Sequence, residues 1–185
     1  MRDKVLIYTM KNVNTLKSAV VILTIASVMF LASTIIMTNM PKALATTEVL
    51  SASLSGDKEV PPVKINATGS AGFSQPHFGN MSYGIQLSDI DKVTAAHIHQ
   101  GNEGKNGPVI VTLFKADNNT GTGPVKGQLV NGSITNSMLE GPLKGKTLEG
   151  DLIKAIKNGE AYVNVHTTDH PDGAIRGQIV MGGIR

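Results

Sequence analysis

Two histidines stand one residue apart in the stretch AAHIHQGNEGKNG, residues 95–107. The chain contains five histidines, and two of them within three positions suggest a chemical role. Side chains alternate across a β-strand, and His97 and His99 would therefore project from one face, with Ile98 on the other. Such a pair lets two ring nitrogens reach one metal ion at about 2.0–2.1 Å. The alternative is a strand that carries imidazole on its solvent-facing side.

A third histidine stands in the stretch YVNVHTT. Here Val163 and Val165 share one face, whereas Asn164 and His166 share the opposite one. If the aliphatic side chains mark the core, all three histidines lie on outward faces near strand ends. Nitrogen ligands without thiolate suit Cu(II) or Zn(II), and the order of affinities favours copper. The spacing alone leaves open whether the two histidine strands are neighbours.

Acidic residues follow both histidine stretches. Glu103 lies in the glycine-rich loop after the first, and Asp169 and Asp172 lie in the loop after the second. Each could serve as an oxygen ligand or as a hydrogen-bond partner of an imidazole, or could be a solvated loop acid. His77 and His170 also fall in predicted loops. No nucleophile elbow, phosphate loop or EF-hand loop is found in the sequence, so we assign no catalytic residue and favour a protein that is not an enzyme.

Short β-like runs separated by Gly, Pro, Asn and Asp must position these residues. They predict an all-β fold, an antiparallel, Greek-key-like β-sandwich or barrel. The predicted strands lie near residues 48–54, 65–73, 81–87, 93–99, 109–115, 125–134, 161–167 and 174–181.

One short helix interrupts this pattern, within TLEGDLIKAIKNGE. Its apolar side chains, Leu148, Leu152, Ala155 and Ile156, recur at helical spacing. We expect Thr147 to cap the amino end, and a glycine, residue 159, to end the helix in the left-handed conformation.

Charge divides the chain into two parts. Residues 1–45 carry five basic residues and one acidic residue, a net charge of +4, whereas the remaining 140 residues carry 12 basic and 13 acidic residues. The part that should fold is therefore near neutral and lacks the basic surface that binds nucleic acid, which excludes that class.

The N-terminal part is predicted to be a signal peptide, with an uncleaved membrane anchor as the alternative. Residues 18–37 are uncharged and mostly apolar, and Ala43-Leu44-Ala45 fits the signal-peptidase pattern. Either reading places residues 46–185 outside the cytoplasm, secreted or anchored at the cell surface, with the membrane contacted only through this segment. Four Asn-x-Ser/Thr triplets, which are glycosylation acceptors in exported proteins, begin at Asn66, Asn80, Asn118 and Asn131.

Read in order, LSGDKEVPPV, GSAGF, VTAAHIHQGNEGKNGPVIVTLF and GEAYVNVHTTDHPDGAIRGQIV resemble the CHRD domain, named for its occurrence in chordin. The resemblance covers about residues 48–181 and implies an all-β extracellular module. The family pattern includes histidines matching His97, His99 and His166, and an arginine matching Arg176. The resemblance therefore strengthens the metal-site interpretation.

Three functions are open at this point. The first is an exported binding module in which the three histidines hold one copper or zinc ion and Arg176 orients a carboxylate or an anion nearby. The second is a structural or protein-interaction domain with an extracellular or cell-surface partner, in which the histidines are incidental. The third is a copper redox enzyme similar to superoxide dismutase, which ranks last because it needs more ligands than three histidines and a disulfide that a cysteine-free chain lacks.

Overall fold

The structure, a computed structural model, describes residues 48–117 and 120–183. The predicted signal peptide or anchor and Asn118 lie outside the described residues. Within them, nine strands form, and their bounds are β1 Glu48–Ser55, β2 Thr68–Phe73, β3 Asn80–Ile90, β4 Val93–Gln100, β5 Val109–Lys115, β6 Val125–Thr135, β7 Ala161–Thr167, β8 Ile175–Gln178 and β9 Val180–Gly183.

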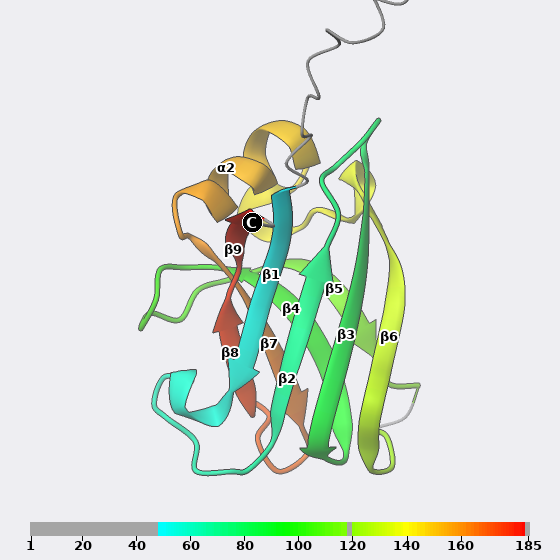
Figure 1. The fold of residues 1–185 in the computed structure, drawn as a ribbon, viewed down its shortest axis with the longest axis vertical. Coiled ribbons are helices and arrows are strands. Elements are labelled where there is room, and N and C mark those ends of the chain that lie inside the picture. The colour runs from blue at the N-terminus through cyan, green and yellow to red at the C-terminus, as the bar shows by residue number, and fades with distance from the viewer. Residues whose placement is uncertain (1–47, 118–119, 184–185) are drawn as a thin grey trace, which may run out of the picture. The chain divides into compact units, whose positions relative to one another are not determined.

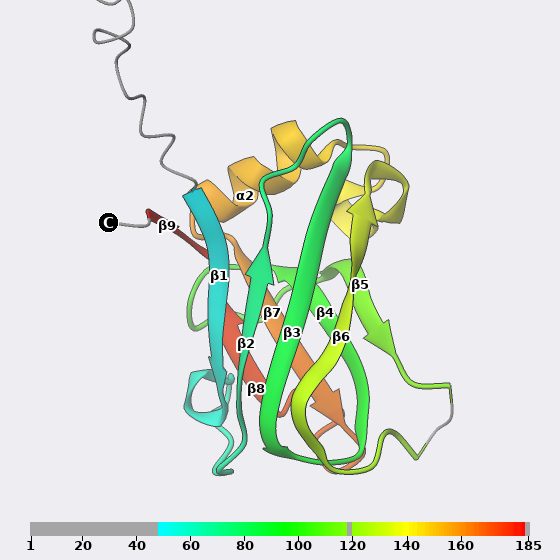
Figure 2. The ribbon, with the colours of Figure 1, turned by 45° about the vertical axis from the view of Figure 1, so that its right-hand side comes forward.

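All strands pair antiparallel in one sheet, in the order β5-β4-β7-β8-β1-β2-β3-β6, with β9 added to β1. The sheet curls into a nearly closed barrel, with β1, β2, β3 and β6 facing β4, β5, β7 and β8 (Figures 1 and 2). Across the open seam, the Tyr83 hydroxyl of β3 donates to the carbonyl oxygen of Leu113 in β5 at 2.5 Å. The predicted all-β antiparallel fold is confirmed.

The barrel interior is aliphatic because alternate residues of each strand point inward. Ile98 of β4 and Val163 of β7 are fully buried, and so are Leu50 of β1 and Ile85 of β3 on the opposite wall. In each strand, the side chains that alternate with these buried residues must therefore point out of the barrel. This alternation sends the histidines of β4 and β7 to the outer face.

The last predicted strand, residues 174–181, is two strands in the structure. β8 pairs with both β7 and β1, whereas β9 pairs with β1. Between them, the buried Ile179 still donates its backbone N–H to the carbonyl oxygen of Ala161, at 2.9 Å. The chain loses its pairing with β7 after this residue, a change that aliphatic periodicity cannot reveal.

The predicted helix is confirmed at one end of the barrel (Figure 1). It begins with a π-helical turn, η4, Leu148–Leu152, and continues as α2, Ile153–Lys157. The Thr147 hydroxyl accepts from the backbone N–H of Gly150 at 3.1 Å, which is the expected amino-terminal cap. Gly159 has φ +72°, the left-handed conformation expected after the last turn. The remaining turns are 3₁₀-helical, namely η1 Gly56–Lys58, η2 Asn136–Met138 and η3 Gly141–Leu143.

Three of the four predicted glycosylation acceptors lie among the described residues. Asn66, Asn80 and Asn131 are exposed, as glycosylation acceptors must be. Among residues 48–117 and 120–183, no helix has the length and apolar character to cross a membrane.

Candidate metal centre

The pairing of β4 with β7 brings the three histidines together. In the register of this pair, Ala95 lies opposite His166, and His97 lies opposite Asn164. Ala95 has a small side chain, so the His166 ring has room to lean toward the β4 histidines. The ring centroids of His97 and His166 lie 4.9 Å apart, and those of His97 and His99 lie 5.7 Å apart.

One ring nitrogen of each histidine belongs to a cluster whose atoms all lie within 4.8 Å of one another. The sequence left open whether the two histidine strands are neighbours, and the pairing of β4 with β7 shows that they are. The part of the chain that the structure describes contains no second cluster of three or more His, Cys, Asp or Glu ligand atoms.

Backbone carbonyls fix the orientation of two of the rings. The Nδ1 of His99 lies 2.9 Å from the carbonyl oxygen of Gly107, and the Nδ1 of His166 lies 2.9 Å from that of Pro171. A carbonyl oxygen only accepts, so each Nδ1 carries the proton and donates it. Each Nε2 then keeps its lone pair, which is the arrangement that metal-binding histidines adopt.

Three ring nitrogens are buried without a hydrogen-bond partner among the described residues, namely His97 Nδ1, His99 Nε2 and His166 Nε2. Burial without a partner is unfavourable for a polar atom. A metal ion is one group that would satisfy all three nitrogens at once.

The histidines are held in the neutral form. Burial, together with repulsion from His166 and His99, lowers the pKa of His97 to about 4. Burial also lowers the pKa values of His99 and His166. Neutral imidazole is the form that coordinates a metal, so no proton has to be removed at neutral pH.

A loop, residues 101–108, covers this outer face and is fastened by one arginine. Arg176 of β8 donates to the carbonyl oxygens of Asn102 and Lys105, at 3.1 and 2.8 Å, and to the side-chain oxygen of Asn106, at 3.0 Å. The guanidinium also lies 3.4 Å above the ring of Tyr162. The covering loop carries the Gly107 carbonyl that orients His99.

Gly107 is required where this loop returns to β4. A Cβ at position 107 would lie 1.6 Å from the carbonyl oxygen of Gln100, so any other residue would push the loop away. The backbone N–H of Gly107 also donates to the Tyr162 hydroxyl, at 3.0 Å.

A scan against protein-family models matches the CHRD domain over residues 50–179. The chain belongs to the CHRD domain family. No curated protein and no solved structure matches the chain. The family assignment drawn from the quoted motifs is confirmed, and the matched span includes all three histidines, Arg176 and the covering loop.

The histidine face of this CHRD domain differs in one respect from the sequence prediction. The histidines do point away from the barrel interior, as predicted, but loops cover them, and the side chains of β7 are buried on both faces. His99 and His166 are only 9% and 8% exposed. Strand periodicity distinguishes two faces and cannot tell which face is covered by a loop.

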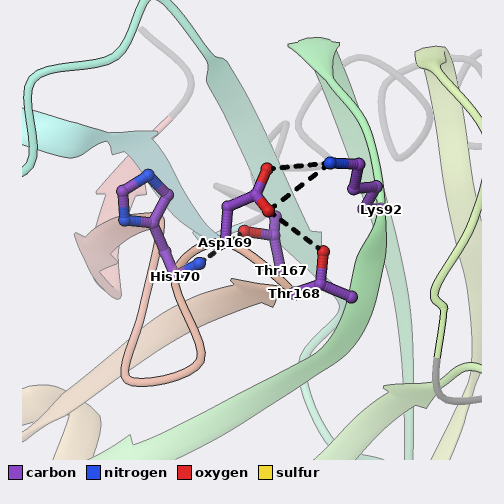
Figure 3. A network of polar contacts seen from close by, with 5 residues as sticks. All are labelled: Lys92, Thr167, Thr168, Asp169 and His170. Carbon is purple, nitrogen blue, oxygen red and sulfur yellow. Dashed lines mark hydrogen bonds and ion pairs between the residues drawn. The ribbon is translucent and has the colours of Figure 1, made fainter.

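Of the three loop acids singled out from the sequence, Glu103 and Asp169 form no contact with the histidine cluster. Glu103 is exposed in the covering loop. The Asp169 carboxylate forms an ion pair with Lys92, at 3.2 Å, and accepts from the Thr168 hydroxyl, at 3.4 Å. Figure 3 shows this carboxylate turned toward Lys92, with the His170 ring turned the other way. The acid that acts on the cluster is Asp172, whose charge partly offsets the lowered pKa of His166.

Three residues beside the cluster were not assigned a role from sequence. The Tyr162 ring stacks on His99, with centroids 5.0 Å apart. Asn164 lies beside His97 and donates to the Glu59 carboxylate at 3.5 Å. Strand alternation placed Asn164 on the histidine face, and it does the same for Tyr162, four residues before His166. No local signal points to Glu59, which is 105 residues away from Asn164 in the chain.

Proposed function

We propose that this CHRD domain is a binding module that holds one copper or zinc ion through His97, His99 and His166. The observation that supports it best is the convergence of three ring nitrogens within 4.8 Å, two of them on rings oriented by backbone carbonyls. The neutral state of the imidazoles and their lack of partners support the same conclusion.

The donor set favours a borderline metal. Three imidazoles without thiolate suit Cu(II) or Zn(II), whereas Ca²⁺ and Mg²⁺ require oxygen ligands. In competition at equal concentration, Cu(II) should bind more tightly than Zn(II). Three protein ligands leave a further coordination position for water or an exogenous group, which is the arrangement of sites that bind ligands on a metal.

The metal content of the purified chain tests this proposal. After exposure to Cu(II) or Zn(II) and desalting, we expect one ion per chain in the wild type and none in the His97→Gln/His99→Gln double variant. His77→Gln and His170→Gln are matched controls, because they remove imidazoles outside the cluster and should retain the ion. Equal retention by the double variant, or no retention by any protein, would refute the proposal.

We also propose that the domain is exported, as the N-terminal sequence predicts. The support is the uncharged run over residues 18–37 and the Ala43-Leu44-Ala45 pattern. N-terminal sequencing of the protein from culture medium and cell envelope tests it. A mature chain beginning at Thr46 supports a cleaved signal peptide, an intact chain in the envelope supports an anchor, and an intact chain confined to the cytoplasm refutes export.

A protein-interaction role at the cell surface is the second candidate function. The observation in its favour is Phe78, which is 90% exposed at the tip of the β2–β3 hairpin. The hairpin tip is fastened, because the backbone N–H of Gly79 donates to the Glu149 carboxylate at 2.7 Å. If Phe78 is an anchor for a surface partner, Phe78→Ser should abolish chemical cross-linking of the protein to intact cells, and unchanged cross-linking would exclude this role for Phe78.

The superoxide-dismutase-like alternative has weaker support. The described residues offer one cluster of three nitrogen ligands, which suits one ion and not a bimetallic centre. A superoxide assay of copper-loaded protein against the His97→Gln/His99→Gln variant decides this alternative.

A further inference from the structure

A second polar site lies beside the histidine cluster, in a pocket of about 250 Å³. Its walls come from the segment after η1 and from the loop after β7. The residues that define its chemistry are Glu59, Asp172, Val60, Pro61, Val63 and Pro171. Asp169 and His170 also line it, so the pocket combines three carboxyl groups and one imidazole with four apolar side chains.

Glu59 is the unusual member of this set. Its side chain is 5% exposed, and its Oε1 has no hydrogen-bond partner among the described residues. Its Oε2 accepts from the Asn164 amide at 3.5 Å, which is a long contact. The charge of Arg176 lowers the pKa of Glu59, but the guanidinium donates its hydrogen bonds to the covering loop. The carboxylate therefore lacks a direct cationic partner.

Gly173 maintains this arrangement at the pocket wall. A Cβ at position 173 would lie 2.7 Å from Glu59 Oε1 and 2.8 Å from Asn164 Oδ1. The residue also has φ +144°, which disfavours other residue types. Both oxygens thus lie against a backbone that has no side chain of its own.

Charge and shape together narrow the ligand class. Asp169 also lines the pocket but is already paired with Lys92 (Figure 3), so the carboxylates without a cationic partner are Glu59 and Asp172. A guanidinium pairs best with two carboxylate oxygens in a fork, whereas only one oxygen of Glu59 lacks a partner. An ammonium group is a point donor that one oxygen can accept. The apolar wall suits an alkyl chain and not a hydrated metal ion.

We infer that this pocket binds an alkylammonium group, with the ammonium on Glu59 and the alkyl chain against Val60, Val63 and Pro171. The group could belong to a lysine side chain of a polypeptide or to a free amine, and both present the same chemistry. The site does not require a metal ion. It borders the candidate metal centre, because the carbonyl oxygen of Pro171 also orients His166.

NMR titration of the metal-free full chain tests the inference. The probes are pentylamine, N-acetyl-lysine methylamide and the neutral analogue 1-pentanol, at about pH 8, where the amines are charged. We expect both amines to shift the backbone amides of Glu59 and Gly173, and to bind about tenfold or more tightly than the alcohol, since a charge-assisted hydrogen bond is lost. Tighter binding of the lysine derivative would assign the natural group to a polypeptide, and tighter binding of pentylamine to a free amine.

Two pocket variants and one matched control make the test specific. Glu59→Gln keeps the side-chain shape and should weaken amine binding about tenfold or more. Asp172→Asn, at an exposed position, should weaken it about two- to fivefold without disturbing the fold. Glu103→Gln removes an equal charge outside the pocket and should leave the affinity unchanged.

Binding of 1-pentanol as tight as that of pentylamine would overturn the inference, and so would undiminished amine binding by folded Glu59→Gln. If Glu59→Gln does not fold, the alcohol comparison and Asp172→Asn decide the question alone. If Ca²⁺ shifted the same backbone amides and displaced the amines, the pocket would be a cation site of another class, and this result would also overturn the inference.

Discussion

Polar atoms without partners are concentrated on the outer face of β4 and β7. Besides the three histidine nitrogens, Asn164 Oδ1 and Glu59 Oε1 are buried without a hydrogen bond among the described residues. Each such atom lowers the free energy of unfolding relative to a satisfied one. Native folds keep unsatisfied groups of this kind chiefly where a ligand completes them.

His97 should make the stability of the metal-free protein depend on acid. Its pKa is about 4 in the folded chain against 6.5 for a free imidazole, so the unfolded chain binds an extra proton between these values. The contribution of His97 to the free energy of unfolding should therefore fall as the pH drops from 6.5 to about 4. Chemical denaturation in EDTA measures this, and His97→Gln should show a shallower fall. The exposed His77→Gln variant should follow the wild type, and an identical slope in His97→Gln would contradict the expectation.

Glu59 should act with the opposite sign. Burial raises its pKa from 4.5 to about 7, so the folded chain keeps a proton that the unfolded chain releases. This contribution to stability is present below pH 4.5 and is lost as the pH rises through about 7. Glu59→Gln removes the linkage, so its stability relative to the wild type should increase over that range, as measured by urea denaturation. Glu103→Gln, at an exposed loop position, provides the baseline.

At the scale of elements, the loop over residues 101–108 makes a metal centre possible on an outer strand face. It lies against His99 and Tyr162 and supplies the Gly107 carbonyl that sets the tautomer of His99. Gln178 extends the fastening, since its side-chain amide donates to the carbonyl oxygens of Gly101 and Gly159, at 2.9 and 2.6 Å. The loop after β7 does the same for His166 through Pro171.

Arg176→Lys should loosen the covering loop. The buried guanidinium makes three hydrogen bonds to the loop, and a lysine ammonium cannot reproduce that planar geometry. We expect the free energy of unfolding to fall by about 2–4 kcal/mol and the metal affinity to fall with it. Thermal or chemical denaturation and metal titration measure both quantities. Lys126→Ala, at an exposed strand position, should change stability by less than about 0.5 kcal/mol, and equal effects of the two variants would contradict the role of Arg176.

For the whole molecule, a bound ion would join two strands that are distant in the chain. An ion that binds only the folded state stabilises it by RT ln(1 + [L]/Kd), about 2.7 kcal/mol when the free metal exceeds Kd a hundredfold. Cu(II) or Zn(II) should therefore raise the unfolding temperature of the wild type and leave that of His166→Gln unchanged. Scanning calorimetry with and without metal measures the shift, and a shift of equal size in His166→Gln would indicate binding elsewhere.

The sequence by itself determined the all-β class, the helix over residues 148–157 and the face on which each histidine lies. These features are local: alternation assigns the face of a strand residue, and Thr147 and Gly159 set the helix ends by their own conformational preferences. The quoted motifs also identified the family correctly.

Only the tertiary structure decided that the histidines meet. Ala95 and His166 lie opposite each other in a register set by packing of the barrel interior, and no local pattern encodes a pairing between distant strands. The same holds for Arg176 beneath the covering loop and for Glu59 beside Asn164. Burial of these polar groups results from long-range packing, and burial is what lowers the pKa of His97 and raises that of Glu59.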